Sequence, residues 1–319
     1  MESARTKTPF TNGLRAAMRL SPSLLALVAL IIVSSLISEY FLTSRNIANV
    51  LRQSSITGFM ALGVTMAIIV GGIDLSTTGI LAVSAVVGAM LVNKLGPLLT
   101  VLLCVGMGAL FGLANGLIIT KGKLEPFICT LGTATVCGGL ALLICDGRTV
   151  IVDLPPAIKY LSNGVILGIP SPVVFMLLTY ALFGIILNKT VFGRWVFAVG
   201  GNQEVARLAG VNVGLVKTIV FVLSGALSAL GGVFHLSRIG VGDPIAGVGM
   251  TMTVIACAVI GGNSFAGGSG GVGLTMIGLL IMGIIGNILT LLGFSYYIQE
   301  VARGIIIVAA VLLANLRRR

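Results

Sequence analysis

The stretch Leu215–His235, LVKTIVFVLSGALSALGGVFH, holds a single charged residue, Lys217, and is otherwise dominated by apolar and small side chains. About 20 consecutive residues of this kind are long enough to cross the hydrocarbon core of a bilayer as an α-helix. Glycine and serine within such a run let neighbouring membrane helices approach closely. The stretch therefore predicts a membrane-spanning helix.

The composition of the whole chain agrees with this prediction. Of 319 residues, 57% are hydrophobic and only 9% are charged, and the mean hydropathy is +1.13. A soluble domain carries roughly a quarter charged residues. The composition thus excludes an ordinary soluble protein and indicates an all-α, polytopic helical membrane protein.

Ten apolar runs are candidates for spanning the membrane. They are Pro22–Ser38, Gln53–Gly71, Ser76–Leu95, Leu98–Thr120, Phe127–Ile144, Pro172–Leu187, Leu215–His235, Ile245–Ile260, Val272–Leu292 and Ile298–Ala314. Ile245–Ile260 is the weakest, because it is short and flanked by glycines, and it also fits a re-entrant half-helix.

Basic residues give the expected orientation. Ten spans place both termini on one side, and Lys and Arg are about twice as frequent on that side, which the positive-inside rule assigns to the cytoplasm. The net charge of +11 therefore needs no nucleic-acid partner. We expect residues 1–21 to form a cytoplasmic tail, residues 22–319 to form one transmembrane domain, and Asp146–Pro170 to form an external loop with a short helix around Ala157–Leu161.

A polar passage, GRWVFAVGGNQEVARLAGVNV (Gly193–Val213), interrupts the apolar chain. Asn202 is a good N-cap, Glu204 falls in the first turn, and Gly210 is placed to end a helix over Gln203–Ala209. Two turns are too short to be stable alone. The pattern leaves two interpretations open, an interfacial connector and a docking element for a cytoplasmic protein.

A second polar passage, GGIDLSTTG (Gly71–Gly79), places Asp74 close to the hydrocarbon core of the membrane. An ionised carboxylate at this depth is energetically unfavourable. Gly71 and Gly72 permit a turn, and Asp74 or Ser76 can accept hydrogen bonds from the amides that open the next helix. The alternative is direct contact with a translocating ligand. Asn115 and Asn287 are further candidates for such a pathway, although hydrogen bonds between packed helices explain them equally well.

The glycine run GGNSFAGGSGGVG (Gly261–Gly273) contains two patterns that are weak in this context. A dinucleotide fingerprint would need a βαβ unit, and a nucleophile elbow would need an oriented histidine. His235 is the only histidine, so an intramembrane protease using Ser269 and His235 is a minor alternative. The sequence has neither a phosphate-binding loop nor a spaced set of metal ligands, and we expect neither a metal nor a cofactor. The run also echoes Ile68–Leu81, which is a weak sign of an internal repeat.

Five motifs in order resemble the permease subunit of ribose-type ABC importers, which take up monosaccharides. They are GGIDLSTTG, KGKLEPFICTLGT (Lys121–Thr133), the polar passage Gly193–Val213, VLSGALSALGGV (Val222–Val233) and AVIGGNSFAGGSGG (Ala258–Gly271). The chain departs from the family after Gly240, because Gly247–Met252 lacks the acids that commonly stand there.

The resemblance implies a multi-pass permease of the bacterial inner membrane that is not itself an enzyme. It implies a separate cytoplasmic ATPase, an extracytoplasmic sugar-binding protein and a second permease chain, with a homodimer favoured over a heterodimer. It also implies that the polar passage is the coupling helix that meets the ATPase, through Arg194, Gly201, Asn202, Glu204, Arg207 and Gly210. The alternative function is an ATP-independent secondary carrier or channel for a small polar solute.

Overall fold

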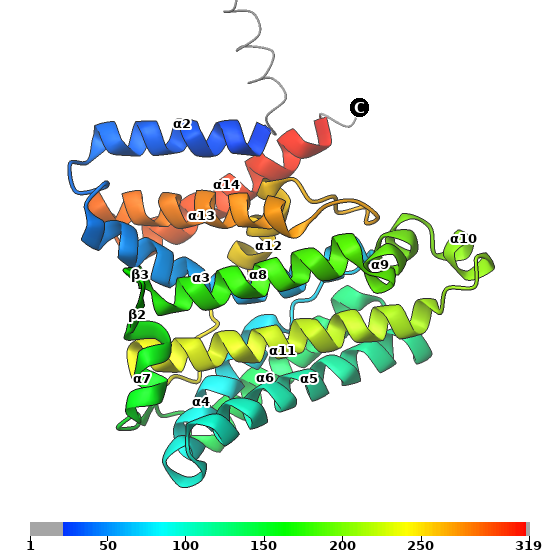
Figure 1. Cartoon of the computed structure of the whole chain (residues 1–319), viewed down its shortest axis with the longest axis horizontal. Coiled ribbons are helices and arrows are strands. Elements are labelled where there is room, and N and C mark those ends of the chain that lie inside the picture. Colours follow the sequence, from blue (N-terminus) through cyan, green and yellow to red (C-terminus); the bar gives the residue numbers. More distant parts are fainter. Residues whose placement is uncertain (1–21, 317–319) are drawn as a thin grey trace, which may run out of the picture.

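The computed structural model describes residues 22–316 as a bundle of helices that lie side by side (Figure 1). The expected cytoplasmic tail, residues 1–21, and Arg317–Arg319 lie outside the described residues. Each of the ten predicted runs overlaps one helix. These helices are α2 (Pro22–Ile37), α3 (Ser44–Ile69), α4 (Thr77–Leu95), α5 (Pro97–Lys121), α6 (Pro126–Ile144), α8 (Ser171–Lys189), α11 (Val213–Ile239), α12 (Met250–Gly261), α13 (Val272–Leu291) and α14 (Tyr296–Leu316).

Six of these helices, α4, α5, α6, α8, α11 and α13, are long and apolar enough to cross a membrane by length and composition within residues 22–316. The fold class is therefore all-α and polytopic, while ten spans and the cytoplasmic termini stay predictions. Helix α12 has only 12 residues. At about 1.5 Å per residue it is about 18 Å long, well short of the ~30 Å hydrocarbon core. This length favours the half-helix interpretation of Ile245–Ile260.

The predicted external loop and the polar passage occupy opposite ends of the bundle. The loop holds α7 (Pro156–Asn163), β1 (Val150–Ile151), which pairs with β4 (Val241–Gly242), and β2 (Val165–Ile166), which pairs with β3 (Ile169–Pro170). The polar passage forms α9 (Val191–Gly201) and α10 (Gln203–Leu208) at the other end, as Figure 1 shows. Helix α8 connects the two ends.

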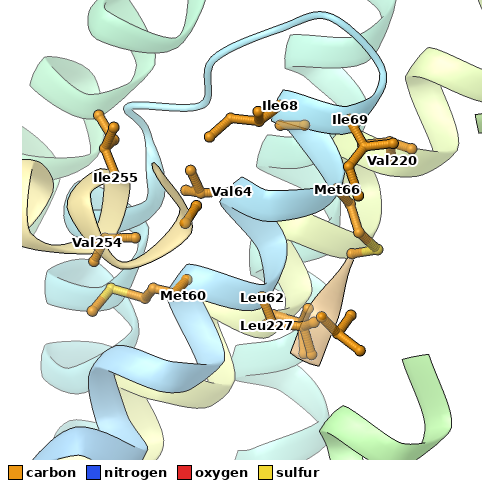
Figure 2. Close-up of a cluster of buried hydrophobic side chains, with 14 of the residues drawn as sticks. Met60, Leu62, Val64, Met66, Ile68, Ile69, Val220, Leu227, Val254 and Ile255 are labelled. Atoms are coloured by element: carbon orange, nitrogen blue, oxygen red, sulfur yellow. The ribbon is translucent and has the colours of Figure 1, made fainter. Parts of the chain in front are cut away.

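Helix α3 lies at the centre of the bundle. Every residue from Ser54 to Ile69 is buried, and the helix packs against α8, α11, α12 and α13. Figure 2 shows Met60, Leu62 and Met66 of α3 among apolar side chains of α11 and α12. Helix α3 is thus enclosed by its neighbours from Ser54 to Ile69, whereas the apolar faces of α5 and α6 remain exposed.

Helices α5 and α11 meet through glycines. Gly108, Gly112 and Gly116 recur every four residues on α5, so they lie along one face. A Cβ atom added at Gly108 would collide with the carbonyl oxygen of Gly225, and one at Gly112 with the carbonyl oxygen of Phe221. The two backbones thus approach more closely than any larger residue permits, the packing expected of membrane helices.

We predict that Gly112→Val lowers the free energy of unfolding by about 2 kcal/mol or more, because its side chain would overpack the α5–α11 contact. Gly106→Val is the matched control, since Gly106 lies on the same helix with open space around its Cβ position. Thermal unfolding of the purified protein in detergent measures both variants. Equal melting temperatures for the two would contradict the packing argument.

Candidate functional site

The polar passage is held by local capping. Thr190 Oγ1 accepts a hydrogen bond from Gly193 N at 3.2 Å and opens α9. Asn202 Oδ1 accepts from Glu204 N and Val205 N, both at 3.0 Å, and opens α10. Gly210, with φ +81°, closes α10, since Gly210 N donates to Arg207 O and the next amide to Ala206 O. The helix thus begins and ends as its sequence indicates, whereas α9 was not predicted.

Helix α10 exposes nearly its whole surface. Ala206 is its only buried residue, while Val205 is 60% and Leu208 88% exposed. Arg207 Nη1 lies 2.7 Å from Glu204 Oε1, but both side chains are mostly exposed, so this ion pair contributes little stability. Arg194 is also exposed and donates to Thr190 O at 3.4 Å. A two-turn helix that presents leucine and valine outward is suited to contact with another molecule.

Two glycine turns meet the end of α9 beneath this segment. Gly268 N, in the loop between α12 and α13, donates to Ile69 O at the end of α3 at 2.9 Å. A Cβ atom at Gly200 would collide with Ile69 O, and one at Gly267 would crowd Gly200 and Gly71. This glycine junction, formed by Gly71, Gly200, Gly201, Gly267 and Gly268, joins α9–α10 to α3 and to the α12–α13 loop. The glycines in the sequence indicated the turns, but the sequence did not predict that these segments contact one another.

Asp74 lies in a buried polar network rather than in an open path. It is 1% exposed; its Oδ1 accepts from Ser76 N at 2.9 Å and from Ser76 Oγ at 2.5 Å, and its Oδ2 from Ser224 Oγ at 2.6 Å. None of the ion pairs among residues 22–316 involves Asp74. The carboxylate therefore holds its own turn and α11, not the first amides of α4, whose N-cap Ser76 makes no side-chain capping bond.

Asn115 belongs to the same network. Its Nδ2 donates to Ser76 Oγ at 3.0 Å, and its Oδ1 accepts from Thr133 Oγ1 at 2.5 Å. Asn115 is completely buried, so its contacts match the helix-packing interpretation. Gly72 closes α3, since its amide donates to Ala67 O at 2.8 Å.

Asn287, in contrast, borders a polar cavity. Asn287 and Asn46 exchange two side-chain hydrogen bonds, at 2.7 and 2.9 Å, and thereby tie α13 to α3. The cavity lies among α3, α11, α12, α13 and α14 and has a volume of about 640 Å³, within the range of small-molecule sites. His235, which lines it, follows Phe234, whose carbonyl oxygen accepts from Ser162 of α7, so the cavity is near the external-loop end.

Most of this cavity was not predicted, although the sequence of α3 carries a signal for it. Asn46, Asn49, Gln53 and Thr57 all line it. Their spacing of three and four residues places them on one face of α3. The predicted span began only at Gln53, so the first polar turns were outside the helix considered.

The structure is inconsistent with the protease alternative. His235 lies near α7, whereas Ser269 follows Gly268, which packs on Ile69 and Gly201 beside α9 at the opposite end. A serine nucleophile needs a base within hydrogen-bonding reach. Within residues 22–316 the only histidine is thus far from Ser269.

Comparison with known proteins gives a consistent result. A family profile described as branched-chain amino acid transport system / permease component matches residues 46–311. The ribose import permease protein of Bacillus subtilis (strain 168) is 43% identical over 291 residues, which are 91% of this chain and 90% of that protein. The D-allose transport system permease protein of Escherichia coli (strain K12) is 38% identical over 287 residues, covering 89% and 88% of the two chains. No solved structure matches.

We predict that Asp74→Asn keeps most of the free energy of unfolding, since an amide can still accept a hydrogen bond from Ser76 and donate one to Ser224. Asp74→Leu should lower the free energy of unfolding by about 2 kcal/mol or more, because the buried donors lose their acceptor. Detergent melting curves and solute uptake test both variants. Loss of uptake in a stable Asp74→Asn protein would instead show that the charge itself is needed.

Proposed function

Because the chain belongs to the permease-component family of branched-chain amino acid transport systems, we propose that it is the membrane-spanning permease of an ABC importer for a monosaccharide. It resides in the bacterial inner membrane as a multi-pass protein. It is not the enzyme of the system, since ATP is hydrolysed by a separate subunit.

One observation supports a monosaccharide as the substrate class. Relatives that match about nine-tenths of this chain are named as permeases for ribose, D-allose and L-arabinose. All three are monosaccharides, and a cavity lined with amide and hydroxyl side chains suits hydroxyl groups. These relatives are 35–43% identical to this chain over about nine-tenths of its length.

The two ends of the bundle differ, and we assign a different partner protein to each. We place α9 and α10 in the cytoplasm, together with both termini, where the ATPase binds. The end with α7 then faces a sugar-binding protein outside the cell. Residues 22–319 act as one permease domain, and two copies form the transporter as a homodimer.

Coupling is assigned to the α9–α10 segment. Arg194, Glu204 and Arg207 present charge to the ATPase, and Gly201, Asn202 and Gly210 shape the helix that carries Val205 and Leu208 outward. Its exposed apolar side chains and its position at one tip of the bundle support this role (Figure 1). The glycine junction beneath it connects the segment to α3, whose other end lines the cavity.

The proposed function predicts that proteoliposomes containing the permease and its ATPase take up a monosaccharide only when ATP and the binding protein are supplied. A labelled panel of D-ribose, D-allose and L-arabinose tests this directly. Liposomes with the permease alone, under an imposed ion gradient, are the control. Uptake by the permease alone would favour a secondary carrier and contradict the proposal.

For coupling, we predict that Leu208→Asp reduces retention of the ATPase in a detergent pull-down about tenfold or more, as expected when a central apolar contact becomes charged. Gly210→Val should act similarly, because valine resists the φ of +81° at the helix end. Leu167→Asp, at an exposed turn at the opposite end, is the matched control. If both test variants retained the ATPase fully, α10 would be only a connector between α9 and α11.

A further inference from the structure

We propose that the cavity binds a polyhydroxylated solute that carries an anionic group, a carboxylate or a phosphate, with Arg238 as its principal ligand. This inference rests on the proposed function and narrows its substrate class. It starts from the side chains of the cavity wall, which among the described residues include Arg238, Arg303 and His235 but not a single Asp or Glu.

The two arginines of the wall differ in their partners. Arg303 Nη1 lies 2.5 Å from Glu300 Oε1, so its charge is balanced within α14. Arg238, on α11, has neither an ion pair nor a side-chain hydrogen bond with any of the residues 22–316 and is half-buried. Its guanidinium lines the cavity without a bound carboxylate, so it is available to a bound anion.

A second cation adjoins Arg238. Arg52 of α3 is half-buried, its Nε is shielded from solvent without a hydrogen-bond partner in the described chain, and its charge repels that of Arg238. His235 Nε2, one helical turn before Arg238, is likewise buried and unpaired. The nearby acid Asp243 acts on His235, but its Oδ1 accepts from Ile245 N at 3.0 Å. Two facing helices thus present cationic and donor groups, none of which forms an ion pair within residues 22–316.

The rest of the wall suits hydroxyl groups. Asn49, Gln53, Thr57 and Thr253 line the cavity, and their side chains make no hydrogen bond within residues 22–316. Val248, Gly249 and Met250 also border the cavity and add no charged side chain to it. Free amides and hydroxyls beside an unpaired guanidinium match a sugar ring with one acidic substituent, since guanidinium binds carboxylate and phosphate in a bidentate manner.

The test compares pairs of solutes that share a ring and differ in the acidic group. D-glucuronate is compared with D-glucose, and D-ribose 5-phosphate with D-ribose, by thermal stabilisation of the full-length permease in nanodiscs at matched ionic strength. We expect at least one anion to bind about tenfold or more tightly than its neutral partner, the effect of one charge-assisted hydrogen bond. Glucuronate identifies a carboxylate site and ribose 5-phosphate a phosphate site.

Arg238→Gln should abolish this preference, and Arg238→Lys should retain part of it. His235→Glu, which places an acid one turn from Arg238, should also reduce it. Arg45→Gln is the matched control, because Arg45 is exposed at the start of α3. Each variant is first checked for a single size-exclusion peak and for retention of the ATPase.

Equal binding of both members of each pair, or an unchanged preference in Arg238→Gln, would overturn the inference. ATP-driven uptake of neutral monosaccharides would continue in that case, so the proposed function would stand. If potassium sulfate stabilised the permease as strongly as the sugar acids, the site would be one for anions alone, and the inference would also fall.

Discussion

The structure depends on one constraint, the complete burial of α3 from Ser54 to Ile69. A membrane helix surrounded by protein must fit its neighbours on every face, because lipid cannot fill a gap left there. The helix packs against α8, α11, α12 and α13, so its position fixes theirs. Its first turns carry the amides of the cavity, and its last carbonyl accepts from Gly268 of the glycine junction. One rigid element therefore touches both candidate sites.

This continuity suggests how work at one end could reach the other. Gly200 of α9 packs so closely on Ile69 that a methyl group would not fit between them. A shift of α9–α10 would thus press directly on α3 and on the α12–α13 loop. Both α12 and α13 also line the cavity. The contact between Gly200 and Ile69 physically connects the α9–α10 segment with the cavity. A change in solvent access to the cavity on ATPase binding would show that the two sites are coupled.

Much of the fold could be predicted from sequence because hydropathy is a local property. Helices α4, α5, α6 and α8 begin and end within two residues of the predicted runs, and α10 has the cap at Asn202 and the stop at Gly210 that its residues indicate. The short α12 was ambiguous for the same reason, since glycines flank an apolar run without fixing its length. The early start of α3 was missed because its first turns are polar, and those turns face a cavity rather than lipid.

The sites were harder to predict, because they join residues that are distant in the chain. Asp74 and Asn115 looked alike as polar residues at membrane depth, yet they meet each other through Ser76, while Asn287 meets Asn46 at a cavity. Only the packing of α3, α5, α11 and α13 decides which polar residues join the buried network and which border the cavity. Arg238 gave no sequence signal beyond its charge, since its lack of a partner is a property of the folded chain.

The most direct test of the account is a cryo-electron microscopy structure of the permease with its ATPase and a transported solute. We predict solute density in the cavity among α3, α11 and α13, within hydrogen-bonding distance of Gln53 or Arg238, and the ATPase in contact with α10. Solute density beside Asp74 and Asn115, with the cavity empty, would contradict it.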